Sequence, residues 1–306
     1  MEQLHYNVIV IGGGPGGYTA ALYSARSGLS VLILEKMAVG GQMATTTTVE
    51  NYPGFDVGVD GWELGEKMKS GAERFGAVSQ YGDVQKVELA GKVKKVVTDM
   101  GEYTADTVIL ATGAAPRELV LPRERELRGR GVSYCATCDG RFYQGKTVIV
   151  AGGGNSAAAD ALALSKLCKK VYLVHRRGEL RASRSYDAPL KAADNIEFIL
   201  NAQIEELLGD PALTGVRYLD KATGEEKVLE ADGLFVAIGR VPTTELFQGQ
   251  IDLDPQGYID ADETTRTNLE GVYAVGDVRR KPLRQIVTAV GDGATASKFI
   301  EEYLFQ

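Results

Sequence analysis

The chain has 306 residues, of which 44% are hydrophobic and 25% are charged, a balance typical of a globular protein with room for two domains. A formal net charge of -7 argues against nucleic acid as a partner, and no apolar run approaches the ~18 residues of a membrane span. Because the first residues lead directly into an apolar strand, without a basic region or cleavage site, we expect a cytoplasmic protein that does not bind membranes.

The first motif is a glycine-rich loop between an apolar strand at residues 7–11 and a helical pattern. Gly12, Gly14 and Gly17 have the G-x-G-x-x-G spacing, which permits a tight turn, close approach of a pyrophosphate and packing of the helix on the strand. The next apolar strand leads to Glu35, whose carboxylate can accept hydrogen bonds from an adenosine ribose. Strand, loop, helix and carboxylate together predict a dinucleotide site.

Two later apolar strands end at glycine turns, Ala111-Thr112-Gly113 and Ile238-Gly239. Pro116 and Pro242 lie just beyond these turns, where proline stiffens a crossing between domains. The sequence therefore predicts an inserted domain at residues 116–242 and a discontinuous domain formed by residues 1–115 and 243–306.

The expected inserted domain contains the cysteine pair Cys135 and Cys138, whose spacing favours a redox disulfide. The alternative is half of a zinc site, but the only other thiol and imidazole ligands are Cys168, His5 and His175. Their positions do not suit a shared metal, and we expect none. Asp139 would protonate a leaving thiolate if burial raises its pKa, and the alternative is a surface carboxylate without a role. Cys168 lies in an apolar, helix-like run and is expected to be a structural thiol.

A second strand–loop–helix unit follows the cysteines. The apolar strand at residues 147–151 precedes a loop with Gly152, Gly154 and Ala157 at the fingerprint positions. Its second strand leads to His175-Arg176-Arg177, with Arg181 further on, where the first unit has a carboxylate. Guanidinium groups there favour the 2′-phosphate of NADP(H), and a solvated basic turn is the alternative.

Near the C-terminus an apolar strand ends at Gly276-Asp277 and is followed by Arg284-Gln285 and a run of small residues at 288–294. Such a run lets a helix bring its N-terminus, with its partial positive charge, close to a large ligand with a reduced ring. The basic stretch Arg279-Arg280-Lys281 between them is interpreted as a solvated turn, with a partner-docking patch as the alternative.

From about Tyr6 to the C-terminus, these motifs resemble the low-molecular-weight bacterial thioredoxin reductases, and the run Cys135-Ala136-Thr137-Cys138-Asp139-Gly140 is the most specific of them. The resemblance implies an α/β fold of two Rossmann-like dinucleotide-binding domains of the three-layer ββα type, with the NADPH domain inserted into a discontinuous FAD domain. It also implies a homodimer.

By that resemblance FAD contacts Gly12–Gly17, Glu35, Asp277, Arg284 and Gln285, whereas NADPH contacts Gly152–Ala157, Arg176, Arg177 and Arg181. Further cofactor contacts are expected at Pro15, Gly41, Gln42, Asn51, Ala111, Thr112, Gly113, Asn155, Ser156, His175, Ile238, Gly239 and Gly276. One departure is Ala158-Ala159-Asp160, which replaces a stretch usually richer in glutamate. Its expected effect is on packing at the nicotinamide side or on the geometry of hydride transfer.

The implied reaction passes hydride from NADPH to FAD, and electrons from FAD to the Cys135–Cys138 disulfide and on to oxidised thioredoxin. Because nicotinamide and disulfide both need to come within about 3–3.5 Å of the flavin, the inserted domain would rotate between the half-reactions. Cys138 is expected nearer the flavin and Cys135 nearer the partner. The alternatives are reduction of a glutaredoxin-like or peroxiredoxin-system partner, or a redox-sensing flavoprotein with little turnover.

Overall fold

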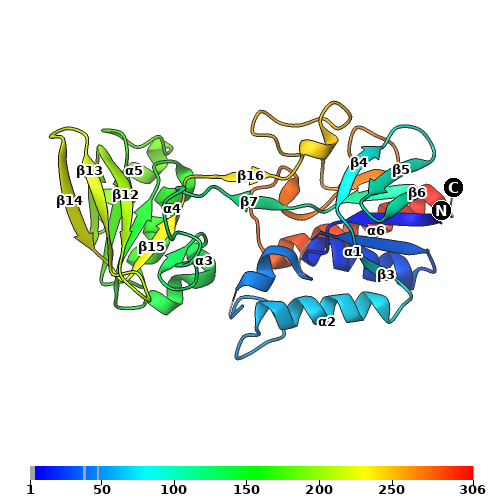
Figure 1. Ribbon diagram of the computed structural model, residues 1–306, viewed down its shortest axis with the longest axis horizontal. Helices are drawn as coiled ribbons and strands as arrows, with labels where there is room; N and C mark the ends of the chain where they lie inside the picture. The colour runs from blue at the N-terminus through cyan, green and yellow to red at the C-terminus, as the bar shows by residue number, and fades with distance from the viewer. Residues whose placement is uncertain (1–3, 37–38, 47, 306) are drawn as a thin grey trace. The chain divides into compact units, whose positions relative to one another are not determined.

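The computed structural model describes residues 4–36, 39–46 and 48–305, and the chain forms two compact units (Figure 1). The discontinuous unit comprises Met1–Ala115 and Val241–Gln306, and the inserted unit comprises Pro116–Arg240. The second boundary therefore lies two residues before the position expected from Pro242. Strands β7 (Ala114–Pro116) and β16 (Arg240–Pro242) carry the chain across the boundaries and pair with each other.

The discontinuous unit is built on a seven-stranded sheet in the order β3-β2-β1-β6-β5-β4, with β17 also paired to β6. Five strands are mutually parallel: β1 (Leu4–Ile11), β2 (Val31–Glu35), β3 (Val78–Tyr81), β6 (Gly101–Leu110) and β17 (Val272–Ala274). β4 (Val84–Glu88) and β5 (Lys94–Thr98) pair antiparallel beside the first half of β6.

The central strands of this sheet are buried on both faces, as their uninterrupted apolar sequences predict. On one face Val8, Val10 and Ile33 pack with residues of α1 and α6, and on the other Ile9 and Leu32 pack with β4 and β5. The helical elements of the unit are α1 (Pro15–Arg26), η1 (Gly41–Thr45), α2 (Gly61–Glu73), η4 (Glu245–Phe247), η5 (Gly276–Val278) and α6 (Ile286–Leu304).

The inserted unit repeats this plan with a five-stranded parallel sheet in the order β11-β10-β9-β15-β8 and a three-stranded antiparallel sheet, β12-β13-β14. The parallel strands are β8 (Val132–Ser133), β9 (Thr147–Ala151), β10 (Lys170–His175), β11 (Ile196–Leu200) and β15 (Gly233–Val236). The antiparallel strands are β12 (Ala202–Leu208), β13 (Gly215–Asp220) and β14 (Glu225–Glu230).

Two cores cover the two faces of this parallel sheet. Ile149 and Leu234 pack with Val216 of the antiparallel sheet, whereas Val148 and Phe235 pack with the helices. The helical elements are α3 (Ala136–Asp139), η2 (Gly140–Tyr143), α4 (Asn155–Ser165), η3 (Arg184–Tyr186) and α5 (Asp187–Ala192). Each unit is thus a three-layer ββα domain, which confirms the predicted fold class. Among the described residues, no helix is long and apolar enough to cross a membrane.

Cys168 lies just beyond α4, which ends at Ser165, rather than inside a continuous helix. Its N–H still donates to the Leu164 carbonyl at 2.8 Å, and the residue is only 6% exposed. Burial raises the pKa of the Cys168 thiol to about 11. The predicted structural role is confirmed, because a buried thiol that stays protonated reacts poorly.

Gly293 provides a stability test of the contact between α1 and α6. A Cβ at this position would overlap the Gly16 carbonyl oxygen and come within 2.8 Å of the Ala20 backbone nitrogen. Gly293→Ala should therefore destabilise the protein by about 1–3 kcal/mol through overpacking. Gly291→Ala, on the same helix with nothing within 4 Å of its Cβ position, should instead stabilise it by roughly 0.5–1 kcal/mol. Urea unfolding of both variants measures the two effects, and shifts of the same sign would contradict this account.

Candidate functional site

Both glycine loops leave the start of the following helix open. Gly14 caps α1 and Gly154 caps α4, and neither helix has a side-chain cap or an acidic residue in its first turn. A Cβ at either glycine would meet nothing within 4 Å. The free N–H groups and the partial positive charge of each helix therefore face space that a pyrophosphate can enter. The fingerprint residues Pro15, Asn155 and Ser156 form the first turns of these helices.

The other glycines of the fingerprints hold strand, loop and helix in close contact. A Cβ at Gly17 would overlap the Gly12 carbonyl oxygen, and one at Gly12 would lie 2.8 Å from the Ala111 carbonyl carbon. In the inserted unit a Cβ at Gly152 would lie 3.0 Å from the carbonyl carbon of Ala237, the residue after β15, and 2.8 Å from the Cβ of Ala157. Each loop therefore meets the end of the neighbouring strand, where Thr112-Gly113 and Ile238-Gly239 follow.

Glu35 points back to the first glycine loop, where its Oε2 accepts a hydrogen bond from the Gly13 N–H at 2.8 Å. The carboxylate also lines a small cavity with Tyr18 and Tyr81. A carboxylate acceptor beside the glycine loop is where the sequence predicts the contact with an adenosine ribose, and that contact stays a prediction.

Further expected residues of the discontinuous unit are tied together by side-chain hydrogen bonds. The Asn51 amide donates to Gln285 Oε1 at 3.0 Å, and Gln285 caps α6. The Gln42 amide donates to the Ala114 carbonyl at 2.6 Å, and Thr112 Oγ1 donates to the Thr243 carbonyl, also at 2.6 Å. Gly41 faces Gly14, with 3.4 Å from its Cβ position to the Gly14 Cα. The structure thus gathers these residues in one unit with the first glycine loop.

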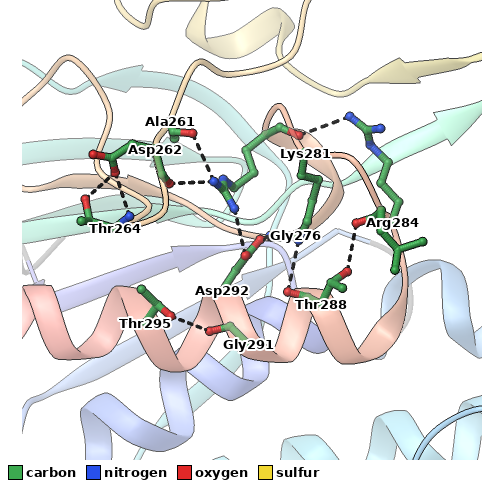
Figure 2. A network of polar contacts seen from close by, with 12 residues as sticks. Ala261, Asp262, Thr264, Gly276, Lys281, Arg284, Thr288, Gly291, Asp292 and Thr295 are labelled. Atoms are coloured by element: carbon green, nitrogen blue, oxygen red, sulfur yellow. Dashed lines mark hydrogen bonds and ion pairs between the residues drawn. The ribbon is translucent and has the colours of Figure 1, made fainter.

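The turn after β17 is fixed by a buried network that sequence reasoning did not find (Figure 2). Asp292, on α6, accepts hydrogen bonds from the Gly276 N–H and pairs with both Arg279 and Lys281. The interpretation of Arg279 and Lys281 as a solvated turn or a docking patch was wrong, because only Arg280 of the three is exposed. The sequence does contain one signal for this network: a single carboxylate, Asp292, stands among the small helical residues that follow the basic turn.

The inserted unit presents three exposed arginines, Arg176, Arg177 and Arg181, around its glycine loop. Among the described residues none of them forms a salt bridge. The Arg181 N–H donates to the Gly153 carbonyl at 2.6 Å, and the Ser183 N–H donates to Asn155 Oδ1 at 2.7 Å. These bonds hold the segment that begins at Arg181 against the loop. A contact of the exposed guanidinium groups with an anionic group of the dinucleotide stays a prediction.

His175 lies beneath this loop, 5% exposed, and its Nε2 has no hydrogen-bond partner among the described residues. A Cβ at Gly153 would come within 2.5 Å of that Nε2. Burial lowers the pKa of His175, and the positive charges of Arg181, Arg177 and Arg176 lower it further. The imidazole is therefore uncharged at neutral pH, with one polar atom left for a ligand or water.

Cys135 and Cys138 form a disulfide with 5.3 Å between their Cα atoms. The Cys138 N–H donates to Cys135 Sγ at 3.2 Å, an interaction that would stabilise a thiolate on Cys135 after reduction. The Ser133 hydroxyl donates to Asp139 Oδ2 at 2.6 Å and also accepts from the Cys135 N–H at 3.1 Å. Ser133, which sequence reasoning missed, thereby joins the carboxyl group to the disulfide.

The proton-donor role expected of Asp139 requires that burial raise the pKa of its carboxyl group. Burial raises the pKa of its carboxyl group, although the Ser133 hydroxyl and Arg128 act in the opposite direction. The inserted unit therefore combines a disulfide, a nearby carboxyl group whose pKa is raised by burial, and the arginine-flanked loop.

Residues 6–293 match the family model described as pyridine nucleotide-disulphide oxidoreductase. The chain belongs to this family. It is 46% identical over 304 residues to a thioredoxin reductase of Mycolicibacterium smegmatis, covering 99% of this chain and 98% of that protein. A solved thioredoxin reductase of Streptococcus pyogenes has a TM-score of 0.93 at 43% identity, with 99% of both chains covered. The resemblance inferred from the motifs is confirmed, and the protein is a flavoprotein disulfide oxidoreductase that uses FAD and NADPH.

The residues of both units fit these family cofactors. For FAD, the open Gly14 position, the free start of α1 and Glu35 offer a cradle for pyrophosphate and ribose. For NADPH, the open Gly154 position adjoins the arginines and the unpartnered His175 Nε2. The contacts of individual residues with either cofactor remain predictions.

The family departure at Ala158-Ala159-Asp160 places a carboxylate on the second turn of α4. Ala158 is buried and Ala159 is exposed, while Asp160 is half-buried. Burial raises the pKa of Asp160 to about 6, and the charge of Arg240 opposes that shift. The departure therefore keeps one acidic group near the NADPH loop, and this group titrates close to neutral pH.

The environment of His175 predicts a response to the 2′-phosphate. A phosphate between the arginines would offset their positive charge and raise the pKa of His175. Adding 2′,5′-ADP should shift the His175 titration to higher pH, whereas 5′-AMP, which lacks the 2′-phosphate, should not. The chain has only two histidines, so proton NMR follows both, and His5→Gln assigns the signals. Equal shifts with both nucleotides would contradict a site for the 2′-phosphate at this position.

Proposed function

We propose that the protein is a thioredoxin-disulfide reductase, in which electrons from NADPH reach thioredoxin through FAD and the Cys135–Cys138 disulfide. The observation that carries this proposal is that one chain holds two dinucleotide loops and a disulfide adjoining a carboxyl group with a raised pKa. A relative from Mycobacterium leprae, 47% identical over 305 residues, is a bifunctional thioredoxin reductase/thioredoxin. Its fusion of the two activities supports thioredoxin as the partner.

The bound FAD supplies the redox chemistry that links NADPH to the disulfide. Reduction breaks the Cys135–Cys138 bond with two electrons and one proton, which leaves a thiolate on Cys135 and a thiol on Cys138. The Cys135 thiolate, stabilised by the Cys138 N–H, then attacks one sulfur of the partner disulfide. Asp139 can give its proton to the leaving thiolate. The Cys138 thiol then returns its proton to Asp139 and attacks the mixed disulfide, which restores the Cys135–Cys138 bond and releases the second partner sulfur as a thiolate that takes up a proton from water.

We also propose that the inserted unit rotates between the two half-reactions. The disulfide and the arginine-flanked loop both belong to this unit, and each must bring its reactive group within about 3–3.5 Å of the flavin. A hinge at the two connecting strands, β7 and β16, would allow each to approach in turn.

The alternative functions differ in the protein that accepts the electrons from the Cys135–Cys138 pair. Reduction of a glutaredoxin-like or peroxiredoxin-system protein would use the same residues, because acceptor choice depends on surface complementarity. A redox sensor would hold the same cofactors but consume little NADPH. Steady-state NADPH consumption with a panel of purified disulfide proteins separates all three, and we expect thioredoxin to give the highest kcat/KM.

A homodimer in the cytoplasm is proposed on the family resemblance. Sedimentation equilibrium of the FAD-loaded protein measures the assembly directly. Fractionation of the cells that make the protein locates it, and a membrane or secreted pool would contradict the proposal.

Replacement of either active cysteine should separate the two halves of electron transfer. Cys135→Ser and Cys138→Ser should each abolish thioredoxin reduction but leave flavin reduction by NADPH nearly unchanged, because hydride reaches the flavin before a thiol is needed. Stopped-flow absorbance follows the flavin, and a separate assay follows thioredoxin. Cys168→Ala is the matched control and should retain both steps. Near wild-type turnover in either serine variant would exclude this disulfide as the route.

The arginines should decide between NADPH and NADH. Each charge-assisted contact is worth roughly 1.5–3 kcal/mol, so two contacts allow a preference on the order of a hundredfold or more. Replacing Arg176 and Arg177 together with alanine should raise the KM for NADPH far more than the KM for NADH. Equal increases in the two constants would indicate a general structural role instead.

A further inference from the structure

Three charged side chains are buried together between the β17 turn and α6. The side chains of Arg279, Lys281 and Asp292 are only 4%, 6% and 12% exposed. Arg279 Nη1 lies 3.0 Å from Asp292 Oδ1, and Lys281 Nζ lies 2.7 Å from Asp292 Oδ2. Such burial is costly unless the charges are paired and hydrogen-bonded, so the geometry of this cluster is closely constrained.

The cluster ties the β17 turn to the start of α6 (Figure 2). Asp292 Oδ2 accepts from the Gly276 N–H at 2.8 Å, and Lys281 Nζ donates to the Thr288 carbonyl at 3.1 Å. Arg279 Nη2 donates to the Ala261 and Asp262 carbonyls, at 3.2 and 2.6 Å. Lys281 and Asp292 thus fix the segment that contains Gly276-Asp277 against the helix that follows Arg284-Gln285.

The cluster has more positive than negative charge. Arg279 and Lys281 share a single carboxylate, that of Asp292. Two further charged groups adjoin it, half-buried Asp277 and Arg284, whose guanidinium reaches the Asp277 and Arg279 carbonyls. Among the buried and half-buried groups, three cations and two carboxylates leave one positive charge in excess. The Asp262 carboxylate also interacts with Arg279, but Asp262 is exposed and solvent screens its charge. The start of α6, where Gln285 and Thr288 form a capping box, adds partial positive charge of the same sign.

We propose that Lys281 is a positioning residue for the flavin. It holds the β17 turn against α6, and the excess positive charge that it helps to place makes the protein bind reduced FAD more tightly than oxidised FAD. This inference rests on the proposed contacts of Asp277, Arg284 and Gln285 with FAD. Reduction adds electron density to the flavin ring, so a fixed positive charge nearby stabilises the reduced form more. A buried charge acts more strongly than an exposed one, because solvent screens it less.

Lys281→Met tests the proposal, because it removes the charge and keeps a long apolar side chain. Arg280→Met is the matched control: Arg280 is the next residue, its side chain is 64% exposed, and it pairs at the surface with Asp260. The midpoint potential of the bound flavin, from equilibration with a reference dye, measures the relative affinity for reduced and oxidised FAD. Lys281→Met should lower the reduced-over-oxidised preference about tenfold, which shifts the potential by about -30 mV for two electrons.

Two further variants test the direction of the shift in midpoint potential. Lys281→Arg keeps the charge and should leave the potential near that of the wild type. Asp292→Asn keeps an acceptor for the Gly276 N–H but raises the net positive charge, so it should shift the potential upward, opposite to Lys281→Met. Arg280→Met should leave the potential unchanged.

Equal potentials in Lys281→Met and wild type would overturn the proposal, as would an equal shift in Arg280→Met. A Lys281→Met variant that loses affinity for both forms of FAD equally would show a purely structural tie, which also overturns it. If Lys281→Met fails to fold, a downward or absent shift in Asp292→Asn would do the same. Failure of the wild type to take up FAD at all would instead contradict the proposed cofactor assignment.

Discussion

The close approach of α1 to the loop before it is the constraint on which the discontinuous unit depends. No side chain fits between Gly17 and the Gly12 carbonyl, and the same helix meets α6 at Gly293 without room for a Cβ. Because backbone touches backbone at both places, the start of α1, the end of β6 and the helix α6 are held in a fixed relation. The inserted unit uses the same construction at Gly152, although an alanine takes the third fingerprint position.

The two copies of this construction differ in the charge that follows the second strand. Glu35 accepts a hydrogen bond from the first loop, whereas His175 and three arginines surround the second. A carboxylate favours neutral hydroxyl groups as partners, and guanidinium groups favour phosphate. We infer that one backbone plan serves two nucleotides through a few side chains at the same place in each copy.

Sequence patterns predicted the parts of the fold in which local and tertiary signals agree. β9 coincides with the expected residues 147–151, since a continuous apolar run followed by glycines has few other interpretations. The parallel edge strand β3 and the antiparallel strand β14 were not predicted, because both are largely exposed or half-buried and lack an apolar pattern. The pairing of Asp292 with Lys281 was missed for another reason. A sequence displays charge but not burial, so a basic turn looks the same whether it faces water or a helix.

The burial of Cys168 has a consequence for the chemistry of the reduced protein. With its thiol protonated and shielded, the chain offers maleimides and similar electrophiles only the sulfurs released by opening the disulfide. Labelling before and after addition of NADPH would then count redox centres directly, with an unreacted thiol on every chain as evidence that the fold stayed closed. Cys168 therefore serves as an internal control for the integrity of the fold in this labelling experiment.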